Sequence, residues 1–281
     1  MIRLDSRQIN TFQRDGFLTG LPLLSAEACT QFMNHADKFT QHYPEDVHWA
    51  FDIKANLLFD WVYEIGVTPA LLDVIEDLIG PDILLTNSIF RIKPPGSETR
   101  YGWHQDAARI QVEPPFILAY LAISEATSEN GCLRVIPGSH VAVEPFKLIS
   151  YACERKVART IDVDEGQAVD LTLKQGEVAL FHCNTVHGSG KNFSGRPRFG
   201  LINDYTPAGA RQSTGTGSGQ VVRGRNSGGG FATEKIPVGA FTEDNILSRR
   251  STLMRYPENV LMGPLLTGET PTFADADLQS R

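Results

Sequence analysis

The stretch YGWHQDAARI, residues 101–110, carries a histidine two positions before an aspartate. An extended backbone turns successive side chains to opposite faces, so His104 and Asp106 would point the same way and Gln105 the other way. Two neighbouring side chains of these types can bind a metal ion, and they can also form an ordinary surface salt bridge. The spacing alone leaves both interpretations open.

A metal site needs at least one more ligand, and the stretch GEVALFHCNTVHGSG supplies two candidate histidines. His182 ends an apolar run, where a structural histidine is the ordinary interpretation. His187 follows the turn-forming CNT and precedes small residues, which leave room for a ligand but would also suit a tight turn. With His104 and Asp106, His187 would complete the set of two histidines and one carboxylate that leaves open positions on Fe(II) for a co-substrate and dioxygen.

If that co-substrate is 2-oxoglutarate, its far carboxylate needs a fixed cation. The planar guanidinium of arginine suits a carboxylate. The segment HGSGKNFSGRPRFGL places Arg196 nine residues and Arg198 eleven residues after His187. Residue type does not choose between the two arginines.

The bulk composition restricts the class of partner. The chain has 281 residues, of which 41% are hydrophobic and 21% charged, as in globular proteins. The formal net charge of -7 and the absence of a basic run argue against a nucleic-acid partner. The sequence shows no apolar run of membrane-spanning length and no targeting pattern at its start, so we expect a cytoplasmic protein with no membrane partner. The four scattered cysteines fit reduced thiols.

The elements that must position these residues change character along the chain. The first eighty residues predict helices, one beginning after the N-cap Ser25 and another with Pro69 in its first turn and Gly80 at its end. From Ile83 onward the segments are short, rich in β-branched and aromatic residues and separated by turn residues, which favours an antiparallel sandwich or barrel. Residues 207–230 are rich in glycine and poor in apolar residues, and predict either an inert linker or a functional loop.

Several motifs occur together and in order: INTFQRDGFL, WHQDA, ENGCLRVIPGSH, LKQGEVALFH and VHGSGKNFSGRPR. On these motifs, which extend from Asn10 to Pro207, the sequence resembles the phytanoyl-CoA dioxygenase family of Fe(II)/2-oxoglutarate oxygenases, in its small-metabolite hydroxylase branch. The resemblance implies a mainly β fold with flanking helices, in which N-terminal helices pack on a double-stranded β-helix, a cupin-like jelly roll. We expect one domain over residues 1–265, divided into a helical part (1–80), the jelly-roll core (81–207) and a flexible Gly-rich loop (207–230), followed by a polar tail (266–281).

The resemblance also assigns roles to residues. It implies Fe(II) as cofactor, 2-oxoglutarate and O2 as co-substrates, and three iron ligands: His104, Asp106 and His187. It favours Arg198 for the C5 carboxylate of 2-oxoglutarate. The other residues expected near the co-substrate are Ser189, Asn87 and Trp103. Because Asp106 is a carboxylate where halogenating members have a small residue, the resemblance favours hydroxylation.

Charge is the property of the sequence that bears on the substrate. Cationic residues near the motifs and in the Gly-rich loop suggest a small-molecule substrate that is anionic or zwitterionic, possibilities being an aminoalkylphosphonate, an amino acid or a natural-product intermediate. The side chains expected to contact the substrate are Lys93, Gln105, Arg211 and Arg223. Two further classes remain: a cupin-like zinc hydrolase, because the same three ligands can bind zinc, and a non-catalytic jelly-roll binding protein.

Overall fold

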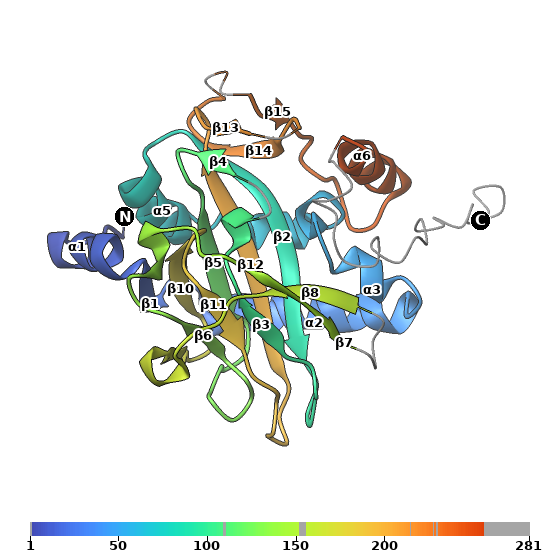
Figure 1. The fold of residues 1–281 in the computed structure, drawn as a ribbon. Helices are drawn as coiled ribbons and strands as arrows, with labels where there is room; N and C mark the ends of the chain where they lie inside the picture. Colours follow the sequence, from blue (N-terminus) through green and yellow to red (C-terminus); the bar gives the residue numbers. More distant parts are fainter. Residues whose placement is uncertain are drawn as a thin grey trace.

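Two sheets, antiparallel except for the parallel pair β14 and β15, form the centre of the computed structural model, which describes residues 2–108, 111–151, 156–213, 215–226, 228 and 230–255 (Figure 1). The larger sheet contains, in spatial order, β1 (Phe17–Pro22), β10 (Glu177–His182), β5 (Ile117–Ala122), β12 (Arg198–Pro207), β2 (Ile83–Lys93), β14 (Ser218–Arg223) and β15 (Ala232–Thr233). The smaller sheet contains β3 (Tyr101–His104), β11 (His187–Ser189), β6 (Leu133–Val135) and β9 (Val169–Leu171). Two further pairs are β4 (Val112–Glu113) with β13 (Arg211–Gln212), and β7 (Lys147–Tyr151) with β8 (Lys156–Thr160).

Helices cover the outer face of the larger sheet. They are α1 (Ser6–Asp15), α2 (Ala26–His42), α3 (Val47–Ala50), α4 (Asp60–Gly66), α5 (Pro69–Ile79) and α6 (Glu243–Leu253). Short 3-10 turns occur at η1 (Ala55–Leu57), η2 (Asp106–Ala108), η3 (Ser139–Val141) and η4 (Glu165–Gln167). As predicted, the Ser25 side chain caps α2 by accepting from the Ala28 backbone N–H at 3.1 Å, and Pro69 stands in the first turn of α5. No helix in the described part of the chain is long and apolar enough to span a bilayer.

Alternation along the strands of the larger sheet creates two hydrophobic cores. One face, with Phe90 and Leu201, packs against helical residues such as Phe32 and Ile75. The other face, with Tyr120 and Phe181, packs against the smaller sheet in a second cluster that includes Leu133 and Val135. This arrangement of a sheet pair with helices on one outer face is the jelly-roll architecture that the motifs predicted. Polar residues of the second face lie inside the barrel.

The Gly-rich segment contributes strands to the fold where a flexible loop was expected. Strand β14 pairs with β2 in antiparallel register, with Gln220 opposite Leu85. Gly219 is needed there because a Cβ atom at this position would lie 2.9 Å from Thr86 Cγ2. Long-range pairing with a free sheet edge therefore orders a segment whose own composition carries little apolar material. The predicted polar tail, residues 266–281, lies outside the described residues.

Candidate metal centre

Strand register brings the two distant histidines together. His187 on β11 lies directly opposite His104 on β3, and their ring centroids are 4.2 Å apart. The His187 ring also packs against Phe181, at 4.9 Å between centroids, and only 3% of the residue is exposed. The smaller sheet therefore presents both imidazoles to the barrel interior at one point, although 83 residues separate them in sequence.

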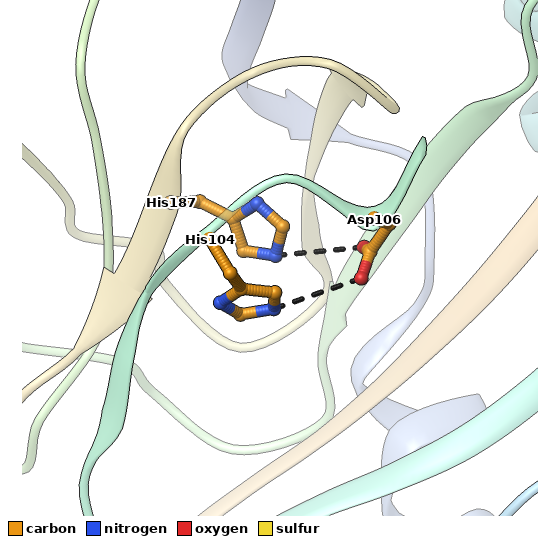
Figure 2. Close-up of side chains that lie close together, drawn as sticks. All are labelled: His104, Asp106 and His187. Atoms are coloured by element: carbon orange, nitrogen blue, oxygen red, sulfur yellow. Dashed lines mark ion pairs between the residues drawn. The ribbon is translucent and has the colours of Figure 1, made fainter. Parts of the chain in front are cut away.

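A turn, and not a continuing strand, brings Asp106 to the same point. Strand β3 ends at His104, and η2 begins at Asp106 because the Asp106 and Ala107 N–H groups both donate to the Cys183 carbonyl, at 3.0 and 3.2 Å. The Asp106 oxygens lie 3.6 Å from His104 Nε2 and 3.6 Å from His187 Nε2 (Figure 2). The expectation of a shared face was correct, but a local change of backbone conformation produces it.

The hydrogen bonds of the imidazoles fit them to bind a metal ion. His104 Nδ1 lies 2.7 Å from the Gly102 carbonyl and His187 Nδ1 lies 2.9 Å from the Thr185 carbonyl. A carbonyl only accepts, so each Nδ1 carries the proton and each Nε2 presents its lone pair toward Asp106, which is the usual outer-shell arrangement for metal-binding histidines. One ligand atom from each of the three residues lies within 4.8 Å of the others. The donor set and its spacing fit Fe(II).

Two buried cations lie side by side further along the barrel. Arg198 opens β12 and faces Lys93 of β2 in register, and their exposed fractions are 1% and 0%. Lys93 Nζ donates to Ser189 Oγ at 2.8 Å and to the Gly190 carbonyl, and Arg198 donates to the Gly131 carbonyl. Burial, together with the positive charge of Arg198, lowers the pKa of Lys93 to about 7.

No carboxylate among the described residues pairs with either of these two cations, and Arg198 Nε has no hydrogen-bond partner there. Two buried positive groups without a counter-ion are costly in the free protein. They form a site that an anion would complete, and they share the barrel interior with the three metal-binding residues.

Comparison with known proteins agrees with this geometry. A family model described as "Phytanoyl-CoA dioxygenase (PhyH)" matches residues 12–200, which contain His104, Asp106, His187, Lys93 and Arg198. The chain belongs to the phytanoyl-CoA dioxygenase family. The relatives named in the comparisons are dioxygenases, and His104, Asp106 and His187 form a group of side chains that could hold a metal ion.

Individual relatives within and around the family act on small molecules. A probable alpha-ketoglutarate-dependent hypophosphite dioxygenase of Stutzerimonas stutzeri is 30% identical over 171 residues, which are 58% of this chain and 59% of that protein, so the match covers less than two thirds of the relative. Ectoine dioxygenase of Bordetella parapertussis is 25% identical over 232 residues, 72% of this chain and 75% of that protein.

Solved structures give the same architecture. The apo form of the non-heme monooxygenase ThoJ superposes with a TM-score of 0.81 and 25% identity, over 93% of this chain and 99% of that one. CytC3 with Fe(II) and alpha-ketoglutarate superposes with a TM-score of 0.63 and 21% identity, over 86% and 97% of the two chains, which supports the fold.

Other predicted site residues lie in different surroundings. Asn87 is inside the barrel, where its Nδ2 donates to Asp204 Oδ2 at 3.1 Å and its Oδ1 accepts from the Lys54 backbone N–H at 2.8 Å. Trp103 points away from His104, as alternation along β3 requires, and its ring lies beneath Arg134 at 5.3 Å. Trp103 is therefore on the outer side of the smaller sheet.

The remaining predicted substrate contacts are not gathered at the metal centre. Gln105 is 1% exposed, and its amide donates to the Ala142 and Asn184 carbonyls, so it fixes the chain next to Asp106. Arg223 pairs with Asp73 and Glu76 of α5, at 2.9 and 2.8 Å. Arg211 is exposed on β13. The structure thus commits Gln105 and Arg223 to internal contacts.

Asp204 is the interior residue that the motifs did not indicate. Asp204 lies on β12, opposite Asn87 of β2, and shares the barrel face of Arg198, six residues earlier. Burial, and next the negative charge of Asp106, raise its pKa to about 7. A period of two counted from Arg198 along RFGLINDYTP would have placed this carboxylate inside the barrel.

Proposed function

We propose that the chain hydroxylates an aliphatic C–H bond of a small metabolite, with Fe(II) held by His104, Asp106 and His187. The observation that carries the proposal is the pair of carbonyl-anchored imidazoles, whose Nε2 atoms converge with the Asp106 carboxylate. When bound, Fe(II) supplies the activation of dioxygen, using electrons released as 2-oxoglutarate is oxidised to succinate and CO2. The protein holds the three ligands in place through the carbonyl contacts of the histidines and the turn at Asp106.

Arg198, Lys93 and Ser189 support the assignment of 2-oxoglutarate. The far carboxylate of this co-substrate would receive the Arg198 guanidinium and the Lys93 ammonium, two cations that have no carboxylate partner in the described chain. Ser189 Oγ accepts from Lys93 and so fixes the position of that ammonium. A bound carboxylate would restore the pKa of Lys93 toward its ordinary value, because an opposite charge favours the protonated amine.

For the substrate, we propose a small anionic or zwitterionic metabolite. The named relatives support this size class, since one is a probable hypophosphite dioxygenase and another an ectoine dioxygenase. An aminoalkylphosphonate, an amino acid and a natural-product intermediate all fit it. The internal ion pairs of Arg223 remove one of the cations that favoured a phosphonate.

A zinc hydrolase would use the same three ligands, but it would leave the buried Arg198 and Lys93 without a ligand. An anaerobic titration separates the two. Apoprotein is given Fe(II) and then 2-oxoglutarate, and the weak visible charge-transfer band of a chelated keto acid is recorded. We expect the band in the wild type, its loss in His187→Ala, and its retention in the exposed-site control His35→Ala. Bound iron without the band in the wild type would overturn the assignment.

A further inference from the structure

A small cavity lies between β2, β4, β12 and β13, and its lining residue Asp204 is close enough to Asp106 to interact with it electrostatically. Its volume is about 50 Å³, and apolar walls are provided by Ile53, Val112, Phe116 and Phe231. Cys183 links this cavity to Asp106. Its N–H donates to the Phe116 carbonyl, and its carbonyl accepts from the Asp106 N–H. The cavity is large enough for a water molecule or for an amino group with its first carbon.

One wall of this cavity carries an incompletely paired carboxylate. Asp204 Oδ2 accepts from Asn87 Nδ2 at 3.1 Å, whereas the Oδ1 atom is closed off from solvent and has no hydrogen-bond partner among the described residues. A carboxylate oxygen in such surroundings is costly unless a donor reaches it. The site therefore calls for a hydrogen-bond donor, and a positively charged one would be bound most strongly.

The nearby basic side chains are held by other groups. Lys54 Nζ donates to Glu234 Oε1 at 2.5 Å and to the Ser218 carbonyl at 3.0 Å. Arg91 donates to the Phe90 carbonyl and lies over the Tyr101 ring, at 5.1 Å. No basic side chain in the described ranges forms an ion pair with Asp204.

The cavity walls select the type of cation. A metal ion requires several oxygen or nitrogen ligands, and the residues described supply such a cluster at His104, Asp106 and His187, a set that does not include Asp204. The lining also carries polar side chains and one lysine, Lys54, whose charge is paired with Glu234. The Asp204 carboxylate together with the rings of Phe116 and Phe231 suits an alkylated ammonium group. The nitrogen of such a group can bind the carboxylate while its carbon atoms contact the rings.

We propose that Asp204 binds the ammonium group of the substrate, so that the hydroxylated metabolite is an amine or a zwitterion that enters this cavity by its cationic end. The inference rests on the proposed function, since it assigns a substrate class to the same site. It makes the internal carboxylate the element of selectivity, in place of the arginines of the Gly-rich segment.

The test compares two probes that differ in charge at the same size: n-butylamine and 1-butanol. Their dissociation constants are measured by calorimetry on the anaerobic protein loaded with Fe(II) and 2-oxoglutarate. We expect wild-type protein to bind the amine at least about tenfold more tightly than the alcohol. Asp204→Asn, which keeps the shape and removes the charge, should reduce that ratio to about threefold or less. Asp170→Asn, a matched change in the carboxylate that pairs with Arg134, should leave the ratio unchanged.

Equal binding of the two probes to the wild type would overturn the proposal and assign the cavity to water. An undiminished ratio in Asp204→Asn would overturn it as well. Should that variant fail to fold, Val112→Phe provides the second test, because the larger side chain fills the cavity and keeps the carboxylate. The amine preference must then disappear. The keto-acid charge-transfer band is recorded in the same samples, and its absence in the wild type would overturn the proposed function separately from this inference.

Discussion

Replacing Arg198 by methionine removes one of two adjacent buried cations and keeps much of the side-chain volume. Losing one partner of a buried, hydrogen-bonded charge pair costs about 2–5 kcal/mol of binding free energy. Lys93 compensates in part, because its pKa, now lowered to about 7 by burial and by Arg198, rises once the neighbouring charge is gone. We therefore expect the lower part of the range, about 2–3 kcal/mol, which weakens 2-oxoglutarate binding about 30- to 150-fold.

The assay is the anaerobic titration of Fe(II)-loaded protein with 2-oxoglutarate, followed by the charge-transfer band. Arg196→Gln is the matched control, because the Arg196 side chain is 69% exposed and pairs with Glu125 at 3.2 Å. Its dissociation constant should stay within about twofold of the wild type, as expected for a solvent-screened pair. Circular dichroism without 2-oxoglutarate establishes that both variants are folded.

The reasoning would be refuted by an Arg198→Met protein that binds 2-oxoglutarate within threefold of the wild type. It would equally be refuted by an Arg196→Gln protein that loses as much affinity as Arg198→Met. Either result would show that Arg198 and Lys93 do not bind 2-oxoglutarate as a pair. The choice between Arg196 and Arg198 as the anchor would then be open again.

Four further outcomes follow from the geometry. Asp106→Ala should abolish product formation. It should also weaken Fe(II) binding, measured by metal analysis after dialysis, by more than about 100-fold, the upper end of the loss caused by removing an outer-shell partner. The affinity for 2-oxoglutarate should fall as pH rises above 7, by at most about tenfold per pH unit. The reason is that Lys93 loses its proton in this range when no ligand is bound, whereas a bound carboxylate favours the protonated form. Titrations from pH 6 to 9 should show this slope in the wild type and not in Lys93→Met. Arg223→Ala should lower the free energy of unfolding by about 0.5–1 kcal/mol, since its two ion pairs are partly screened by solvent, and should leave the KM for 2-oxoglutarate unchanged in steady-state assays. Gly200→Ala should lower the thermal midpoint, because its Cβ would lie 2.5 Å from the Tyr120 ring, an overpacking that costs about 1–3 kcal/mol, and an unchanged midpoint would show that this ring can move aside.

The sequence located the chemistry of the metal centre well because residue type and spacing are local properties. His104 and Asp106 could be paired from two positions of separation, and His187 from its small neighbours. The backbone that joins them was not predictable in the same way. The turn at Asp106 depends on the Cys183 carbonyl, which lies 77 residues away in the sequence, and the same long-range contacts direct Gln105 away from the metal centre.

The Gly-rich segment shows the same limit on a larger scale. Local composition around Ser218 and Gly219 predicts a loop, because the segment has few apolar residues. Strand β14 forms only because β2 offers a free edge and because Glu234 pairs with Lys54 beneath it, and neither partner is visible in the local sequence. Asp204, by contrast, is predictable from the sequence, because the alternation of β12 counted from Arg198 places it inside the barrel.

The cavity beside Asp204 is lined both from within and from beyond the region that the family model matches. The metal ligands, Arg198 and Lys93 all fall within the family-wide region, residues 12–200, whereas Thr206, Gln212 and Phe231 line the cavity from beyond it. Part of the cavity lining can therefore be varied at positions that carry no metal-binding residue. Substitutions at Gln212 or Phe231 would reshape this lining from outside the region that the family model matches, while His104, Asp106 and His187 stay in place.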